Sequence, residues 1–183
     1  MLTKRVTMAT PFHTPIYAYV ILIFIITSFI YKTFFKKNRR HERNKKTSKK
    51  VLEKISSFEN DGQKIAYLRK IDPFVFEELI LDSFAKKGYK VIRNKRYTGD
   101  GGIDGKVIID GDVCLIQSKR YKGLINPKHV REFEELCKKS NVSGFFCHTG
   151  RTSKNLMSEI KKTSYTVLVS GNRLIELITH SAK

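Results

Sequence analysis

Three polar side chains, Asp104, Gln117 and Lys119, are of types that bind a divalent metal ion and activate water. The Asp-Gly pair at 110–111 lies between two apolar runs, which is a strong local signal of a β-hairpin. Counting back from this turn places Asp104 opposite Gln117, and Lys119 shares a face with Gln117 because it lies two residues further along the strand. The sequence therefore predicts that the three side chains converge, although a register shift of one residue would separate them.

Such a set would suit phosphoryl chemistry. Aspartate and amide oxygens are hard ligands of the kind that Mg²⁺ prefers. A lysine beside the ion could orient a water nucleophile and stabilise the charge of a phosphorane-like transition state. The apolar run at 113–116 indicates a central strand, where polar groups are costly unless they are paired or metal-bound. On spacing alone, a strand end that emerges into solvent explains the same residues equally well.

A helix before these strands brings a fourth candidate. Asp72 as the N-cap and Pro73 at the first helical position predict a helix that ends at a Lys-Lys-Gly run. Apolar residues at helical spacing form its core face. Glu77 lies at the edge of that face, where a carboxylate is either a surface acid or a site residue. Glu78 and Asp82 are expected on the far side of the helix.

The remaining periodicity predicts a mixed α/β fold. Strands are expected at 89–93, 103–109, 113–119, 144–148 and 165–169, and further helices at 127–139, 152–162 and 172–179. The order is α-β-β-β-α-β-α-β-α, with one or two lead-in helices over 51–69. Strands that alternate with helices in the second half indicate a mixed β-sheet flanked by helices on both faces.

Three motifs in this framework resemble a known family. They are DPFVFE at 72–77, GDGGIDG at 99–105 and QSKRY at 117–121. In this combination they resemble the Mrr-type (type IV) restriction endonuclease domain of the PD-(D/E)XK nuclease superfamily, over residues 71–178. The resemblance implies a restriction-endonuclease-like fold and the Mg²⁺-dependent hydrolysis of phosphodiester bonds in DNA.

The same resemblance implies a role for each candidate residue. Asp104 would be the central metal ligand, Gln117 the second ligand position and Lys119 the catalytic lysine. Glu77 would be the helix carboxylate that assists the metal site. Gln117 stands where many superfamily members have an acid, although glutamine is common in the Mrr branch. Because an amide attracts a metal ion less than a carboxylate does, Glu77 becomes more important and weak activity is a second expectation. Asp100, on the glycine loop, either contacts the metal or caps the turn.

Basic residues around this candidate site predict contacts with the DNA backbone. They are Arg96, Arg120, Lys122, Arg151 and Lys154. Tyr97 and Tyr121 could stack on or hydrogen-bond to sugar-phosphate. Each cluster alone is more typical of a solvated surface, but all of them flank the candidate metal site. No signal for base-specific contact is visible, so salt-sensitive binding to the DNA backbone is expected. His129 matches no zinc-ligand spacing and is expected on a helix surface.

The first part of the chain differs in composition. The net charge of +19 favours polyanionic partners, yet residues 6–31 contain no charged side chain. The stretch 16–35 has the ~20 residues that a transmembrane helix needs, and no small-residue cleavage site follows it as in a signal peptide. The basic tract 36–50 predicts a C-terminal domain that faces the cytoplasm. This tract would lie on anionic lipid or, alternatively, gather DNA.

The predicted organisation is a tail at 1–15, a transmembrane helix at 16–35, a basic linker with a lead-in helix at 36–70 and an Mrr-like nuclease domain at 71–183. The leading hypothesis is a membrane-anchored, Mg²⁺-dependent DNA endonuclease that restricts foreign or modified DNA. The alternatives are a catalytically weak or inactive DNA-binding protein with the same fold and membrane tether, and a junction-resolvase-like nuclease. Expected partners are DNA and the membrane, with a homodimer as a further candidate. Three cysteines without CxxC spacing disfavour a disulfide framework or a thiolate zinc site.

Overall fold

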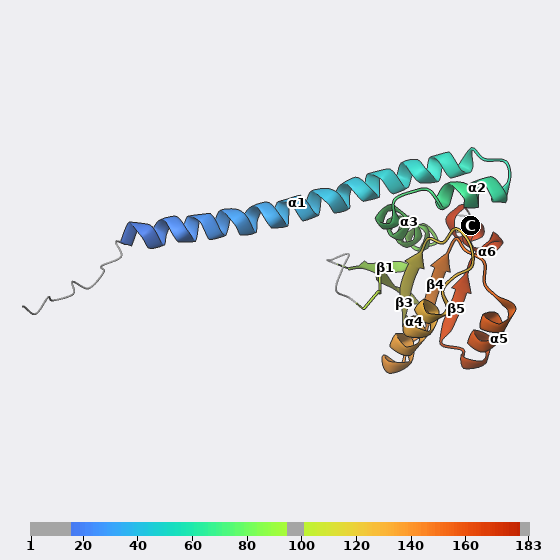
Figure 1. Cartoon of the computed structure of the whole chain (residues 1–183). Coiled ribbons are helices and arrows are strands. Elements are labelled where there is room, and N and C mark those ends of the chain that lie inside the picture. Colours follow the sequence, from blue (N-terminus) through green and yellow to red (C-terminus); the bar gives the residue numbers. More distant parts are fainter. Residues whose placement is uncertain (1–15, 95–100, 180–183) are drawn as a thin grey trace, which may run out of the picture. The chain divides into compact units, whose positions relative to one another are not determined.

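The computed structural model describes residues 16–94 and 101–179, apart from the side chains of 33–38 (Figure 1). The chain divides between His41 and Glu42 into two units. The second unit contains one five-stranded sheet in the order β1-β2-β3-β4-β5. The strands are β1 (Lys90–Arg93), β2 (Gly105–Ile109), β3 (Asp112–Lys119), β4 (Gly144–His148) and β5 (Thr166–Val169). The first three strands pair antiparallel and the last three pair parallel, which confirms the predicted mixed sheet.

The helices that flank the sheet are α3 (Pro73–Lys86), α4 (Pro127–Lys139), α5 (Lys154–Thr163) and α6 (Asn172–Thr179). The predicted element order from α3 to α6 is confirmed. One face of the sheet packs on α3 and α6, with Phe76, Leu79 and Leu174 in a core that also takes in the end of α1. The other face packs on α4 and α5 through Phe133 and Leu156. Both faces of the sheet are therefore covered (Figure 1).

The β2–β3 hairpin has the predicted register. Asp110 and Gly111 both have positive φ, 52° and 93°, as a two-residue hairpin turn with this twist requires. Ile109 pairs with Asp112, and Gly105 pairs with Ile116. β2 begins at Gly105 rather than at residue 103, so Asp104 lies just outside the strand. Its N–H still donates to the carbonyl of Ile116, at 2.8 Å.

α3 begins and ends where the sequence predicts. The Asp72 carboxylate accepts hydrogen bonds from the N–H groups of Phe74 and Val75, and Pro73 occupies the first turn. Gly88, with φ of 87°, follows the helix. This N-cap fixes the first turn of α3 and thereby the position of Glu77 in the second.

The side of α3 that carries Glu78 is covered rather than exposed. The Glu78 side chain is buried, and only 1% of it is exposed. The last part of α1 packs against α3 on this side, where Ser48 donates to Asp82 at 2.7 Å. A wheel drawn for α3 alone contains no information about this neighbour.

The basic tract 36–50 is not an unstructured linker. α1 is one helix, Ile16–Ser56, and α2 (Asp61–Leu68) follows it. Within the second unit, α1 buries Asn44, Ser48, Val51 and Ile55, which recur at helical spacing. Because this face packs on the domain that contains the β-sheet, the tract folds as a helix despite its charge.

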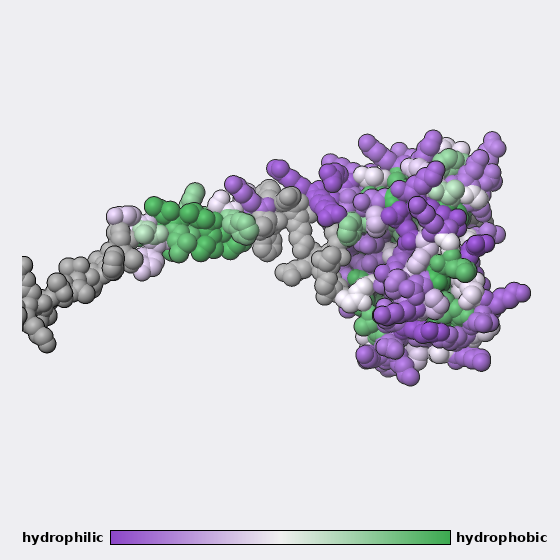
Figure 2. All heavy atoms as spheres, in the orientation of Figure 1, coloured by the Kyte–Doolittle hydropathy of each residue, from purple (hydrophilic) through white to green (hydrophobic). Residues whose placement is uncertain are grey.

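The first part of α1 exposes apolar side chains on all sides, including Ile16, Phe24 and Phe29 (Figure 2). Across the described residues, no helix combines the length and the apolar character that crossing a membrane requires. This finding gives no support to the transmembrane helix predicted at 16–35.

Candidate active site

Asp104 lies at the junction between the glycine loop and β2. One carboxylate oxygen accepts hydrogen bonds from both the N–H and the hydroxyl of Ser118, each at 2.5 Å. Burial raises the pKa of this carboxyl to about 6, although the hydrogen bonds from Ser118 and the charge of Lys119 act in the opposite direction. The structure therefore ties Asp104 to the residue between Gln117 and Lys119 on β3.

Glu77 brings a second carboxylate to the same place from α3. Burial, together with the negative charges of Asp104, Glu78 and Asp72, raises its pKa to about 8. The ammonium group of Lys119 acts in the opposite direction. Two neighbouring, partly buried acids with raised pKa values are common where a ligand or a cation binds.

Gln117 precedes Ser118 on β3, but its side chain makes a different contact. Its side chain is buried, and its Oε1 atom has no hydrogen-bond partner among the described residues. The amide packs against Gly102, where an added Cβ would lie 2.5 Å from Nε2. The structure thus brings Glu77, Asp104 and Lys119 together, whereas the described contacts of Gln117 are to the glycine loop and not to Asp104.

The donor set fits a hard divalent ion. Within residues 16–94 and 101–179, no three His, Cys, Asp or Glu side chains are grouped to hold a metal. The candidate ligands are instead two carboxylates and one amide, from Glu77, Asp104 and Gln117. A buried amide oxygen without a partner is costly unless a ligand satisfies it. A cation would satisfy this oxygen and offset the two negative charges, and oxygen ligands suit Mg²⁺.

A pocket of about 310 Å³ opens beside these groups. Its lining combines the first turns of α3, the C-terminal end of β3 and the first turn of α4. The lining residues are Pro73, Phe76, Glu77, Ser118, Lys119, Arg120, Tyr121 and His129. This candidate pocket contains an acid, an ammonium group and an imidazole, which together can bind a phosphate and act on water.

His129 is the residue of this pocket that sequence reasoning missed. It was expected on a helix surface, but it lines the pocket, and its Nδ1 atom lies 2.6 Å from the hydroxyl of Tyr121. The Asn-Pro pair at 126–127 does place residue 129 in the first turn of a helix. Only the packing of α3 against the end of β3, distant in sequence, shows that this turn faces the candidate metal ligands.

The predicted DNA-binding residues have different surroundings. Arg120 lines the pocket and donates from Nη1 to the carbonyl of Arg69, at 3.0 Å. Lys122, Arg151 and Lys154 are exposed. The backbone of Arg151 pairs with the segment after Lys122, because its N–H donates to the carbonyl of Gly123 at 2.9 Å. Arg96, Tyr97 and Asp100 lie outside the described residues.

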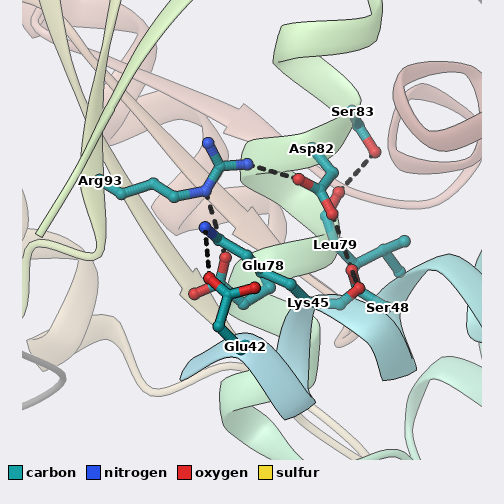
Figure 3. A network of polar contacts seen from close by, with 8 residues as sticks. All are labelled: Glu42, Lys45, Ser48, Glu78, Leu79, Asp82, Ser83 and Arg93. Atoms are coloured by element: carbon teal, nitrogen blue, oxygen red, sulfur yellow. Dashed lines mark hydrogen bonds and ion pairs between the residues drawn. The ribbon is translucent and has the colours of Figure 1, made fainter. Parts of the chain in front are cut away.

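A second polar network, on another side of α3, was also not predicted (Figure 3). Arg93, at the end of β1, donates to Glu78 at 3.2 Å and also pairs with Asp82. Asp82 in turn accepts from Ser48 of α1. Arg93 is the register partner of Gly105, which follows Asp104. The Arg93 side chain therefore links Glu78, which follows Glu77 on α3, to the β1–β2 strand pair, which begins next to Asp104.

Comparison with known proteins points in one direction. A family model described as restriction endonuclease, Mrr_cat, matches residues 68–178. The type IV methyl-directed restriction enzyme EcoKMrr of Escherichia coli K12 is 28% identical over an alignment of 119 residues. The match covers 61% of this chain and 39% of that protein. The chain thus spans well under half the length of this relative.

Two solved structures show weaker likeness. The MspJI restriction endonuclease, in complex with a 27-mer oligonucleotide, covers 72% of this chain and 30% of its own at 18% identity and a TM-score of 0.41. Pyrococcus furiosus SfsA, in complex with Ca²⁺, covers 52% of this chain and 54% of its own at 11% identity and a TM-score of 0.34. Neither overlap is close enough to transfer a site.

Proposed function

The chain belongs to the restriction endonuclease family whose model matches residues 68–178, and on this premise we propose that it is a Mg²⁺-dependent DNA endonuclease. The observation that carries the proposal is the meeting of Glu77, Asp104 and Lys119 beside one pocket. Two acids and an ammonium group are what metal-assisted phosphodiester hydrolysis needs: ligands for a hard ion and a positive charge for the reacting phosphate.

In this mechanism Asp104, Glu77 and the Oε1 atom of Gln117 would hold the ion. The chemistry that such an ion would supply is Lewis-acid polarisation of a phosphate oxygen and a lower pKa of a water molecule. Lys119 orients the attacking water and stabilises negative charge that develops on the phosphate. Ser118 keeps the Asp104 carboxylate in place through two hydrogen bonds. The protein thus contributes position and fixed charge, and the bond that breaks is one P–O ester bond of DNA.

We propose that the substrate is foreign or modified DNA. The support is the relationship to a restriction enzyme that is named methyl-directed. Exposed Lys122, Arg151 and Lys154 would contact phosphates without reading the base sequence, as would Arg96. Because one site of this kind hydrolyses one strand, cutting both strands would take two copies of the chain. Nicked circles at low protein concentration and linear plasmid at high concentration would support a homodimer.

The test uses the full chain with methylated and unmethylated plasmid, in Mg²⁺ and in Mn²⁺. Cleavage is expected from the wild type, and Asp104→Ala or Lys119→Ala should lower the rate at least about 10²–10³-fold. Lys106→Ala and Asp112→Ala, which change exposed residues of the same hairpin, are the matched controls and should cleave normally. Intact plasmid under every one of these conditions would contradict the proposal.

A second candidate is a DNA-binding protein with weak or no nuclease activity. The neutral amide of Gln117, together with the missing third acid among the described residues, favours it. This candidate predicts tight, salt-dependent binding that Asp104→Ala leaves unchanged, and no cleavage by the wild type. A junction-resolvase-like enzyme would instead cut four-way junctions faster than linear duplex, which the same assay can measure.

We also propose that the first part of α1 associates with a lipid bilayer, with residues 42–183 on the cytoplasmic side. The supporting observation is the exposure of its apolar side chains, such as Ile16 at 82% and Phe24 at 73%. Exposed basic side chains follow on the same helix, among them Arg43 and Lys46, and would attract anionic headgroups. Flotation with anionic liposomes tests this proposal. Phe24→Glu with Ile25→Glu should abolish flotation, and recovery of the wild type in the lipid-free fraction would contradict it.

A further inference from the structure

Hydrogen bonds fix the position of the His129 imidazole in the candidate pocket. Asn126 caps α4 and accepts from the N–H of Lys128 at 3.0 Å, so that His129 lies in the first turn. Tyr121 lies just beyond β3, and its backbone N–H and carbonyl both bond to the hydroxyl of Thr149, at 2.9 and 3.0 Å. The tyrosine therefore approaches the imidazole from a fixed backbone, and both rings line the pocket that contains Glu77 and Lys119.

The contact between Tyr121 and Nδ1 of His129 bears on which ring nitrogen of the imidazole carries the hydrogen. Burial raises the pKa of the Tyr121 hydroxyl, and a hydrogen bond from the backbone of Asn126 acts in the opposite direction. The hydroxyl therefore keeps its proton at neutral pH and accepts from a backbone N–H. The hydroxyl can then donate its own proton to Nδ1 of His129, 2.6 Å away. A neutral imidazole that accepts at Nδ1 carries its hydrogen on Nε2.

We propose that His129, positioned by Tyr121, donates an Nε2–H hydrogen bond to a non-bridging phosphate oxygen of DNA bound in this pocket. The inference rests on the proposed nuclease function and adds a substrate contact to it. Nε2 has no partner among the described residues, so it is available to a ligand.

The pocket supplies other features that suit a phosphate at this position. Lys119 and Arg120 contribute positive charge, and Arg120 is held by its bond to the carbonyl of Arg69. The N-terminal end of the 13-residue helix α4 adds a partial positive charge near the imidazole. A hydrogen bond from His129 would fix the phosphate relative to the acids without reading any base. His129 is thus a phosphate-contacting residue, and Tyr121 is a positioning residue that acts through it.

The test compares His129→Asn and His129→Gln in the full chain. The asparagine amide reaches only the place of Nδ1, whereas the glutamine amide reaches about as far as Nε2. A hydrogen bond to a charged group corresponds to about 10- to 100-fold in affinity or rate. His129→Asn is expected to lower kcat/KM by this factor and to weaken metal-free binding of a labelled duplex. His129→Gln should retain most of both, and the thermal midpoint should not change in either variant.

Tyr121→Phe tests the positioning role, with Tyr165→Phe as the control because Tyr165 lines a different pocket. Tyr121→Phe should lower kcat/KM in the wild-type background and have no further effect in His129→Asn, since both changes remove one interaction. Additive losses in the double variant would overturn the positioning role of Tyr121.

The two proposals fail separately. If the wild type cleaves DNA and His129→Asn cleaves and binds equally well, the phosphate contact is overturned while the nuclease function stands. If the wild type cleaves no DNA, the nuclease function is overturned, and the metal-free binding measurement decides the contact. Weaker duplex binding by His129→Asn than by His129→Gln then supports the contact, and equal binding overturns it.

Discussion

Two adjacent glutamates on α3 have opposite surroundings. Glu78 is buried and paired with Arg93, in a network that continues through Asp82 to Ser48 (Figure 3). Glu77 faces the candidate pocket, where Asp104 adds a second negative charge and Lys119 is the nearby cation. In the first region both acids form ion pairs with Arg93, whereas in the second, within the described residues, neither Glu77 nor Asp104 forms an ion pair. The difference separates a structural ion network from a site that is arranged to receive a cation or a phosphate.

Removing the cation of the ion-paired network should have the largest effect on folding. Arg93→Met would leave the buried Glu78 carboxylate without its arginine and should lower the free energy of unfolding by about 3 kcal/mol. Adding Glu78→Gln should restore part of this loss, because the charge that needed a partner is gone. Urea denaturation measures both values.

Lys90→Met is the control for this experiment, since Lys90 is an exposed residue of the same strand. It should change the free energy of unfolding by no more than about 0.5 kcal/mol. If Glu78→Gln restores nothing in the Arg93→Met background, the network is not held by this ion pair and the contrast between the two glutamates fails.

The acids of the candidate pocket should instead make the stability of the fold depend on pH. The Glu77 carboxyl has a pKa of about 8 in the folded chain, against an ordinary value of 4.5. The folded protein therefore binds more protons than the unfolded chain between these values, and its stability must fall as the pH rises through this range. Water screens a partly exposed group, so the expected loss is about 1–2 kcal/mol in metal-free buffer. Melting temperatures measured from pH 4.5 to 8 give the slope.

Glu77→Gln should flatten this pH profile, because the amide does not ionise. Glu53→Gln removes an exposed acid of α1 and should keep the wild-type profile. Added Mg²⁺ should also flatten the profile of the wild type, since the ion would offset the negative charge. A Glu77→Gln profile as steep as that of the wild type would show that ionisation of Glu77 is not what lowers the stability.

Local signals in the sequence determine much of the domain that holds these two regions. The Asp-Gly turn fixes the hairpin register because both residues adopt positive φ, and Asp72 with Pro73 fixes the start of α3. These features depend on neighbours in sequence. The same register could not predict the direction of the Asp104 carboxylate, because β2 begins at Gly105 and strand alternation no longer applies before it. The carboxylate contacts Ser118 instead.

What the sequence could not provide are contacts between distant segments. The burial of Glu78 depends on α1, whose Ser48 lies 34 residues before Asp82. The charges of the basic tract, which the sequence shows, suggest that the tract cannot fold alone. The sequence does not show the surface of the domain against which its buried face packs. His129 enters the candidate pocket for the same reason. Its partner Tyr121 is only eight residues away, but Glu77 reaches the pocket from a helix at the start of the domain.

The smallest expected effect concerns Gln117, the ligand candidate with the least direct contact to the acids. Gly102 and Gly111 both have positive φ, 88° and 93°, so alanine at either position should cost about 1–2 kcal/mol. The two sites differ in what the new methyl group meets. At Gly102 it would lie 2.5 Å from Nε2 of Gln117, whereas at Gly111 nothing lies within 4 Å.

Gly102→Ala should therefore displace the Gln117 amide and raise the Mg²⁺ concentration for half-maximal cleavage about tenfold. Gly111→Ala should lose stability alone and keep the wild-type Mg²⁺ dependence, which makes it the matched control. Titration of cleavage against Mg²⁺ separates the two variants even if their stabilities are equal. The same Mg²⁺ dependence in both variants would exclude Gln117 as a metal ligand. Its buried Oε1 atom would then have to be satisfied by another group.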